Sequence, residues 1–506
     1  MVCSVKTVAF SGIKALDVEV QVSIGAGMPS FIIVGLPDKA VNESRERVRA
    51  VLRAIGVDFP SEHITVNLTP SDVIKEGAHY DLPIALGLLG AMKVIDKNCL
   101  KKYIFMGSLS LDGRIDGVNG VLVAGVKALN DKMGLVCPKT NGGEAVWSGL
   151  EDIVAVEHIL ELMNFLKSEV QIAKPEVMAI KNKEYNIDMA DVKGQESAKR
   201  AMLIAAAGGH NLLMVGPPGA GKTMLAERLV TILPKMNVKE AIETAMVQSV
   251  AGELSDGVSF LRPFRSPHHS ASTPALIGGG RMGIPGEISL ANNGVLFLDE
   301  LPEFSRQTLD ALRQPLENKK AIISRVMAHT EYPAKFQLIG AMNPCRCGYL
   351  GTKEKMCSKA PKCAIDYMSR LSGPFLDRFD MQIEVEAVNP YDLTAKEKGT
   401  TSMEMLKKVE EVREISAERL YKLGVSEMLV NAELKGDLLE KVLDMDEGLR
   451  KDVAEMAQKC GLTARGIMRI LRLARTIADL QYIKKVSRMH VIEALSYRHK
   501  FLKQLH

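Results

Sequence analysis

The chain has 506 residues, enough for two to four domains, and its 46% hydrophobic and 25% charged residues are ordinary for a globular protein. A net charge of +4 is too small for composition alone to indicate a nucleic-acid-binding protein. The first residues show no signal-peptide pattern, and no apolar run reaches about twenty residues. Together with eight scattered cysteines, these features predict a cytoplasmic protein without membrane spans or disulfides.

The chain divides into four sections. Residues 1–165 alternate short β-rich runs with helical patterns, and residues 166–187 are polar and aperiodic, which predicts a linker. Residues 188–390 alternate strand and helix patterns in the way that is typical of a parallel sheet covered by helices. Residues 391–506 show helical patterns alone. The predicted fold class is therefore α/β, followed by a small all-helical domain.

A phosphate-binding loop is predicted between the apolar run "LLMV" and a helix. The motif "GPPGAGKT" consists of Gly216, Pro217, Pro218, Gly219, Ala220, Gly221, Lys222 and Thr223. Glycines let backbone N–H groups surround phosphate oxygens, and the following helix directs its positive end at them. Lys222 would contact the outer phosphates, while the Thr223 hydroxyl would coordinate Mg²⁺. The motif predicts ATP and Mg²⁺ as ligands.

Acidic and amide side chains end two further apolar runs. In "GVLFLDE", a buried strand would direct Asp299 at Mg²⁺, and Glu300 would orient and deprotonate the attacking water. Acidic residues often follow strands, so this motif alone is weak evidence for a magnesium site. It becomes strong evidence in combination with the phosphate-binding loop. Asn343 ends "FQLIGAMN" and would hydrogen-bond the water or the γ-phosphate. Arg378, in "GPFLDRFD", would act on the γ-phosphate from a neighbouring subunit, or form a surface salt bridge.

The stretch "NPCRCGYLGTKEKMCSKAPKC" holds half of the cysteines and begins at Asn343, directly after the apolar run "FQLIGAM". Cys345, Cys347, Cys357 and Cys363 lie within 19 residues. Four thiolates can form a closed tetrahedral Zn²⁺ site, which would be structural because it leaves no open coordination position. The spacing is less regular than in paired C-x-x-C motifs, so free thiols are the alternative.

Basic residues cluster near the end of the chain, where residues 460–506 hold ten Lys/Arg against two acids. Arg465, Arg469, Arg472 and Arg475 recur at helical spacing. This stripe is expected either to contact phosphates, of ATP near Arg465 and of DNA beyond it, or to form a solvated helix face.

Two other segments are candidates for contacts beyond the nucleotide. The stretch "ENKKAIISRVMAHTEYPAKF" consists of two strand-like runs. The family resemblance described below implies that a hairpin at this place projects into the pore of a ring, where Lys319, Lys320 and Arg325 would face DNA. In "RSPHHS", the adjacent His268 and His269 would point apart on a strand and suit no two-ligand metal site. We interpret this segment as a loop insertion that faces a pore or an interface.

In combination, these motifs resemble the AAA+ ATPases, in the branch that contains magnesium-chelatase motor subunits and MCM helicases. The stretches "RPFRSPHHSASTPALIGGG", "PGEISLANNGVLFLDELPEF" and "LTARGIMRILRLARTIADL" resemble the ComM/YifB group of magnesium-chelatase-like ATPases, and the resemblance covers essentially the whole chain. It implies a hexameric ring with ATP sites between subunits, Asn343 as a sensor and Arg378 as an arginine finger. It further implies a helical lid with Arg465, or alternatively Arg469, as the second sensor.

The same resemblance implies single-stranded or branched DNA as the partner and branch migration during natural transformation as the activity. The alternative is a chelatase-type remodeller of a protein or tetrapyrrole–metal partner, which is weakened because no integrin-like domain is encoded.

The first section resembles the Lon-type protease fold (ribosomal S5 domain 2-like), through "NLTPSDVIKEGAHYDLPIALG" and "GSLSLDGRIDGVNG". Proteolysis in that fold needs a serine activated by a lysine. No serine lies between Gly77 and Ala85, and "GVNGVLVAG" replaces the lysine-bearing stretch. The resemblance therefore supports the fold and argues against protease activity.

Overall fold

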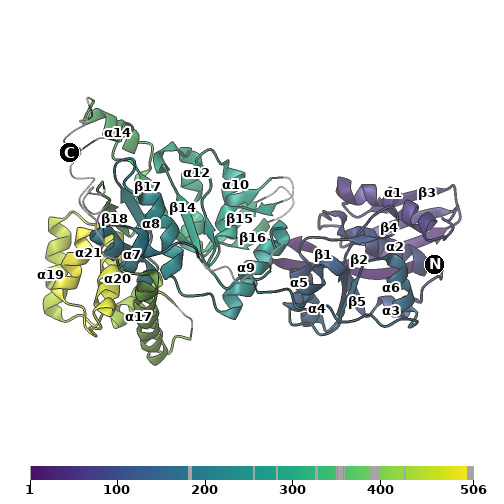
Figure 1. Ribbon diagram of the computed structural model, residues 1–506. Coiled ribbons are helices and arrows are strands. Elements are labelled where there is room, and N and C mark those ends of the chain that lie inside the picture. The colour runs from purple at the N-terminus through teal and green to yellow at the C-terminus, as the bar shows by residue number, and fades with distance from the viewer. Residues whose placement is uncertain are drawn as a thin grey trace.

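The computed structural model describes residues 2–180, 185–254, 257–280, 283–324, 329–348, 350, 357, 359–387, 399–426 and 429–498. Figure 1 shows two bodies joined side by side, with the N-terminal sheet in one and the rest of the chain in the other. In the part of the chain described, no helix is both long and apolar enough to cross a membrane.

The N-terminal body is built on a seven-stranded mixed sheet of order β3-β4-β2-β1-β5-β8-β9. Its strands are β1 (Val2–Ser11), β2 (Lys14–Gly25), β3 (Ser30–Val34), β4 (His63–Thr69), β5 (Tyr103–Phe105), β8 (Gly134–Pro138) and β9 (Ile153–Val156). A small ladder joins β6 (Ser108–Leu109) to β7 (Ile115–Asp116). The helices are α1 (Lys39–Ala54), α2 (Asp81–Ala91), α3 (Lys97–Leu100), α4 (Val121–Asp131), α5 (Gly142–Val146) and α6 (Ile159–Leu166).

The second body contains a five-stranded sheet of order β11-β14-β17-β10-β18, in which every neighbouring pair is parallel. Its strands are β10 (Leu212–Val215), β11 (Phe264–Arg265), β14 (Val295–Leu298), β17 (Gln337–Met342) and β18 (Met381–Glu384). The helices of this part are α7 (Glu196–Gly208), α8 (Lys222–Leu229), α9 (Val238–Ala251), α10 (Thr273–Ile277), α11 (Glu287–Leu290), α12 (Arg306–Ala311), α13 (Arg313–Asn318), α14 (Lys362–Met368) and α15 (Gly373–Leu376). The parallel sheet predicted from the strand–helix alternation is confirmed.

Two short hairpins extend from this body. They pair β12 (Gly278–Gly279) with β13 (Ile284–Pro285), and β15 (Lys320–Ser324) with β16 (His329–Pro333). The second hairpin directly precedes β17, and β16 touches the turn between β1 and β2. A Cβ on Gly12 would lie only 2.0 Å from the carbonyl oxygen of Glu331, so the two backbones are in close contact there.

The two bodies are joined by an apolar cluster between α4 and α9. Leu122, Met236, Ala241, Ala245, Leu254 and Val258 form its buried part, with Trp147 and Met178 packed against it. The Glu144 carboxylate accepts hydrogen bonds from the Leu122 N–H, at 3.1 Å, and from the Ser249 hydroxyl. The indole of Trp147 donates to the carbonyl of Met178 at 3.0 Å. The segment around Met178 is therefore packed against the N-terminal body, whereas Ile180 pairs with Val258 and Tyr185 donates to the carbonyl of Arg262, both in the second body.

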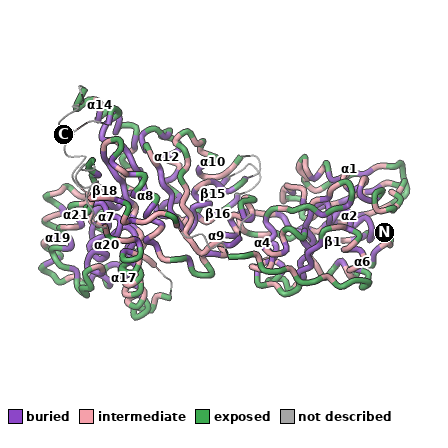
Figure 2. The backbone as a smooth tube through the Cα atoms, viewed as in Figure 1, coloured by how far each residue is buried: buried purple, intermediate pink, exposed green. Residues whose placement is uncertain are grey.

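Helices alone form the described part of the chain after β18. They are α17 (Ser402–Lys422), α18 (Gly436–Leu443), α19 (Glu447–Lys459), α20 (Ala464–Leu480) and α21 (Arg488–Ser496). α20 packs against α7, α17 and α21, and Figure 2 shows buried backbone along both α7 and α20. The helices thus share one apolar core with the parallel sheet.

Candidate nucleotide site and cysteine cluster

The predicted phosphate-binding loop connects β10 to α8 at the carboxyl edge of the parallel sheet. Gly219 and Gly221 adopt φ values of +76° and +84°, a left-handed conformation that glycine takes without steric cost. Gly221 is the N-cap of α8, so the unpaired N–H groups of the first turn face the loop. The local backbone is therefore arranged as a phosphate site requires.

Lys222 lies inside this loop and is linked to the neighbouring strand. Its Nζ donates to the carbonyls of Gly216 and Pro217, at 2.7 and 2.9 Å, and to Asn343 Oδ1 at 3.1 Å. Asn343 is close because β17 is the immediate neighbour of β10 in the sheet. The predicted phosphate ligand and the predicted sensor thus lie in contact.

The predicted magnesium ligands also lie in contact. The Thr223 hydroxyl donates to Asp299 Oδ2 at 2.8 Å, and the backbone N–H of Glu300 donates to Asp299 Oδ1 at 2.8 Å. Hydroxyl and carboxylate oxygens are the ligands that Mg²⁺ prefers, so these residues fit that ion. Burial lowers the pKa of Lys222, and the charges of Asp299 and Glu300 oppose this effect only in part. The ammonium is thus partly desolvated beside two acids, where an anionic phosphate would stabilise it.

Gln195, just before α7, is a site residue that sequence reasoning missed. Its Nε2 donates to the carbonyl of Ala220 at 2.6 Å and to that of Glu386 at 3.3 Å. Its Oε1 is buried and has no hydrogen-bond partner among the described residues. A buried acceptor beside the phosphate loop fits a ligand that supplies an N–H donor, as the amino group of adenine does. The sequence carries no signal for this contact, which depends on the docking of α7.

Arg378 lies at the opposite edge of the sheet from the phosphate-binding loop. It precedes β18, which runs parallel to β10, and its carbonyl accepts from Asn211 Nδ2 at 3.0 Å just before β10 begins. A four-residue strand spans about 13 Å. The guanidinium is largely buried and forms an ion pair with Glu317. The structure therefore separates Arg378 from the loop of its own chain, and the salt bridge left open by the sequence is present.

α20 packs against this same edge, where the parallel strands begin and which we call the amino edge. Arg469 Nε lies 3.6 Å from Asp380 Oδ1, and His210 Nε2 lies 2.8 Å from Thr476 Oγ1. Asp380 lies one residue before β18, and His210 lies two residues before β10. Arg465 is exposed one turn before Arg469. The carbonyl of the next residue, Gly466, accepts from Arg498, which in turn pairs with Asp377 beside Arg378. The structure thus brings Arg465 to the edge that carries Arg378.

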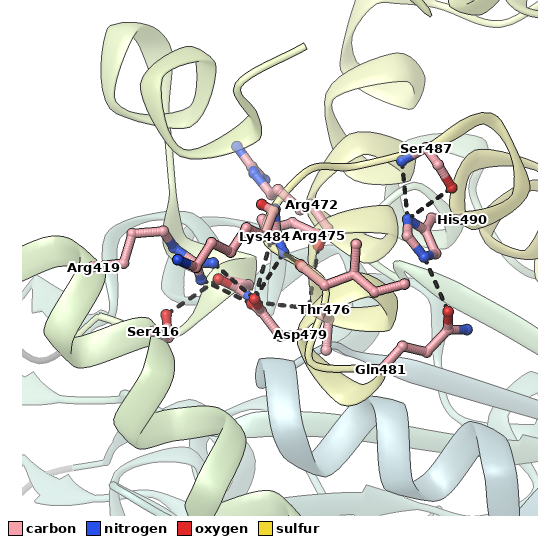
Figure 3. Close-up of polar contacts among 12 residues, drawn as sticks. Ser416, Arg419, Arg472, Arg475, Thr476, Asp479, Gln481, Lys484, Ser487 and His490 are labelled. Atoms are coloured by element: carbon pink, nitrogen blue, oxygen red, sulfur yellow. Dashed lines mark hydrogen bonds and ion pairs between the residues drawn. The ribbon is translucent and has the colours of Figure 1, made fainter.

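Two of the four arginines of the expected stripe on α20, Arg469 and Arg475, are buried, whereas Arg465 is exposed and Arg472 is half-buried. Arg475 is fully buried, and its Nη2 lies 2.9 Å from Asp479 Oδ1 (Figure 3). Arg419 makes two further bonds to the Asp479 carboxylate, at 2.7 and 2.8 Å. Arg469 is also buried. The prediction was wrong for Arg469 and Arg475, because other helices surround α20 and its buried charges must be paired inside the fold.

The lysines expected to face DNA make contacts within the chain. Lys319 is half-buried, and burial lowers its pKa, with the charges of Glu433 and Asp380 acting in the opposite direction. Lys320 is exposed and lies 3.0 Å from Glu331 on the paired strand. Arg325 lies outside the described residues.

The four clustered cysteines converge, with all four Sγ atoms within 4.8 Å of one another. Cys345 is buried and its Sγ lies 3.2 Å from that of Cys347. Zn–S bonds of 2.3 Å in a tetrahedron place sulfurs about 3.8 Å apart, so the cluster fits a metal of this size. Hydrogen bonding with Cys347 raises the pKa of Cys357 to about 11, although a backbone hydrogen bond from Lys359 acts in the opposite direction.

The cysteine cluster abuts the phosphate-binding loop. Gly348, in the turn that follows Cys347, has φ +83°, and a Cβ there would lie 2.5 Å from Pro218 Cδ. Asn343 lies two residues before Cys345. A metal held by the cysteines would thus fix a turn that touches both the sensor residue and the phosphate loop.

His269 contacts the predicted catalytic acid, which sequence reasoning did not foresee. Its Nδ1 lies 3.6 Å from Glu300 Oε2. The structure places His269, in the segment "RSPHHS", at the carboxyl edge of its own sheet.

Three models of protein families match successive parts of the chain. The family described as "Magnesium chelatase, subunit ChlI" matches residues 188–393, "Subunit ChlI of Mg-chelatase" matches residues 18–141, and "Magnesium chelatase, subunit ChlI C-terminal" matches residues 399–498. These matches define the class as magnesium-chelatase-like.

Comparison with individual proteins places the chain in one group within this class. The chain is 44% identical over 499 residues to "Competence protein ComM" of Haemophilus influenzae, covering 97% of this chain and 96% of that protein. It is 41% identical over 498 residues to "Uncharacterized protein YifB" of Salmonella typhimurium, covering 98% and 96%. "Magnesium-chelatase 38 kDa subunit" of Chlorobaculum parvum is 25% identical over 346 residues, covering 62% and 90%. The chain belongs to the ComM/YifB-type group of magnesium-chelatase-like proteins.

Proposed function

We propose that the protein hydrolyses ATP. The observation that carries the proposal is the meeting of Lys222 with Asn343, and of Thr223 with Asp299, at one edge of the sheet. Mg²⁺ held by Thr223 and Asp299 would neutralise phosphate charge. Glu300, next to this pair, would take the proton of the attacking water.

The ATP site is completed, in our proposal, by a second copy of the chain within a hexameric ring. Arg378 lies across the sheet from its own phosphate loop, and Arg465 lies on the same side as Arg378. Placed against a neighbour's open edge, both guanidinium groups would serve that neighbour's nucleotide. Arg378→Ala subunits mixed with parent subunits should therefore inhibit the ATPase rate more than in proportion to their fraction. A strictly proportional loss contradicts action between subunits.

The ring is proposed to move single-stranded or branched DNA, in recombination or natural transformation. Support comes from the relative named as a competence protein. A cleft beside the cysteine cluster also offers basic side chains, from Arg346, Lys359, Lys362 and Arg370, which suit phosphate contacts.

The decisive experiment measures the ATPase rate against a panel of single-stranded, duplex and branched DNA. We expect stimulation by single-stranded or branched DNA, and loss of turnover with retained ATP binding in Glu300→Gln, because the substitution keeps shape and removes the base. A rate that is flat across the panel, with no DNA binding at low salt, contradicts the DNA motor. Parent-level hydrolysis by Glu300→Gln contradicts the role of Glu300.

The remaining sections are proposed to follow the domain plan expected from the sequence. Residues 1–165 would form a Lon-like domain without protease activity, and residues 391–506 a helical lid docked at the amino edge. In the first domain Lys75 is buried and its ammonium donates to the carbonyl of Pro70, a contact that does not activate a nucleophile. Casein should stay intact during incubation with the purified protein and ATP.

The cysteine cluster is proposed to hold a structural Zn²⁺. Elemental analysis of freshly purified protein should find about one zinc per chain, and Cys363→Ser should lower that ratio. Cys460→Ser is the matched control, because Cys460 caps α19 outside the cluster. Protein without zinc, or equal zinc in both variants, contradicts the proposal.

A second candidate function is remodelling of a protein or tetrapyrrole–metal partner. The similarity to a protein named as a magnesium-chelatase subunit favours it. Affinity purification from cells would then recover a large chelatase-like subunit, and the ATPase rate would respond to that subunit rather than to DNA.

A further inference from the structure

The sulfurs of the cysteine cluster are accessible from solvent. Cys347 is exposed and Cys357 and Cys363 are half-buried, whereas Cys345 is buried. Cys363 also lines a cleft of about 620 Å³. The cleft carries more positive than negative charge, because its charged lining residues are Arg346, Lys359, Lys362, Arg370 and Asp366. Sulfurs that bind a cation are thiolates, which basic neighbours stabilise and which peroxides oxidise.

Oxidation would change the distances between the four sulfurs. A tetrahedral metal site separates its sulfurs by about 3.8 Å, whereas the two sulfurs of a disulfide are about 2.05 Å apart. Four cysteines can pair in three ways. In each of them, Cys345 and Cys347 are joined either to one another or to the two later cysteines of the cluster. Every pairing thus displaces the turn that carries Cys345 and Cys347.

This turn is packed against the nucleotide site at both of its ends. The backbone N–H of Gly348 donates to the carbonyl of Cys345 at 2.9 Å and closes the turn. A Cβ on Gly348 would lie 2.5 Å from Pro218 Cδ, so the turn and the phosphate-binding loop are in close contact. Just before the turn, Asn343 Oδ1 accepts from Lys222 Nζ at 3.1 Å. A displaced turn would therefore disturb the phosphate-binding loop and its lysine together.

We propose that the cluster is an oxidation site for hydrogen peroxide, and that its oxidation reversibly lowers the affinity of the phosphate-binding loop for ATP. Each of two peroxide molecules takes two electrons from a pair of thiolates. Its O–O bond breaks as the S–S bond forms, and its oxygens leave as two waters after taking two protons from solvent. The disulfide sulfurs no longer hold the cation, which is released. The inference rests on the metal site and the ATP site proposed above.

The test treats the purified full chain with hydrogen peroxide and measures two quantities before and after. A chromogenic chelator reports the zinc that is released, and titration with a fluorescent ATP analogue reports the dissociation constant. We expect peroxide to release the zinc and to raise the dissociation constant about tenfold, which is the value of one hydrogen bond to a charged group such as Lys222. Dithiothreitol with added zinc should restore the starting affinity. Mass spectrometry of the alkylated protein should find disulfides within the cluster.

The double variant Cys99→Ser/Cys460→Ser is the control, because it removes the two half-buried cysteines outside the cluster. It should lose and regain affinity as the parent does. Dithiothreitol reduces disulfides and leaves methionine sulfoxide oxidised, so recovery separates the two kinds of damage. A control variant that keeps its affinity after peroxide overturns the inference, as does a loss of affinity that dithiothreitol and zinc do not reverse.

Separate outcomes distinguish this inference from the proposals on which it rests. Release of zinc and formation of disulfides with an unchanged dissociation constant would overturn the inference alone. Freshly purified protein without zinc contradicts the metal site, and untreated protein that does not bind the ATP analogue contradicts the ATP site. The inference fails with either of them.

Discussion

The two edges of the parallel sheet differ in whether their charged side chains are paired within the chain. At the amino edge, Asp380 is buried, accepts from the backbone N–H of Asn211 at 3.0 Å and lies 3.6 Å from Arg469. Farther along α20, Arg475 and Arg419 share the carboxylate of Asp479 (Figure 3). This edge joins the helices to the sheet through charges that are paired within the chain.

The carboxyl edge keeps its acids accessible and its buried lysine without a carboxylate partner. Asp299 and Glu300 are not buried, and Lys222 is bonded to two carbonyls and an amide rather than to a carboxylate. Unpaired charges cost stability, and a site that must accept a triphosphate and a cation has to keep them available. Charged side chains in this fold therefore hold the C-terminal helices to the sheet at the amino edge, and are available to bind a ligand at the carboxyl edge.

The largest expected loss of thermal stability comes from breaking a buried ion pair of α20, the helix that packs against the amino edge. Asp479→Ala leaves the buried Arg475 without its carboxylate, and breaking a buried pair in this way costs about 3–5 kcal/mol. We expect the melting temperature, followed by far-UV circular dichroism, to fall by on the order of 10 °C. Asp444→Asn is the control, because Asp444 lies 3.9 Å from Lys485 in an exposed pair. Equal melting temperatures for the two variants would refute the contrast between the edges.

At the carboxyl edge, we expect a substitution to weaken ligand binding while leaving the stability of the fold nearly unchanged. Lys222→Met removes a partly desolvated ammonium and keeps the apolar length of the side chain. ATP affinity should fall by about 10- to 100-fold, the value of one or two charged hydrogen bonds. The melting temperature without nucleotide should stay within about 2 °C of the parent. Titration with a fluorescent nucleotide and a thermal melt measure the two quantities, and a large loss of stability without nucleotide would contradict the comparison.

The sequence predicted the carboxyl edge better than the amino edge, for a physical reason. The phosphate loop, Asp299 and Asn343 each follow an apolar strand directly, so a local pattern is enough to place them. The helical spacing of the arginines on α20 was correct, but their burial depends on which helices surround α20. In the same way, the contact of His269 with Glu300 needs the strand order, and the docking of Gln195 needs the position of α7.

The smallest expected effect is a dependence on pH at Asp380. Burial alone would raise the pKa of this carboxyl, but the neighbouring His210, with the charge of Arg469 and the backbone N–H of Asn211, lowers it below the ordinary value. A lowered pKa in the folded state means that Asp380 stabilises the fold above the unfolded pKa of about 3.9, and that this stability is lost as the pH falls through the folded value. Asp380→Asn should therefore be less stable than the parent at pH 7. The difference in urea midpoint should narrow once the pH falls below about 4. A difference that is constant from pH 7 to pH 3 would mean that the carboxylate charge does not hold α20 to this edge.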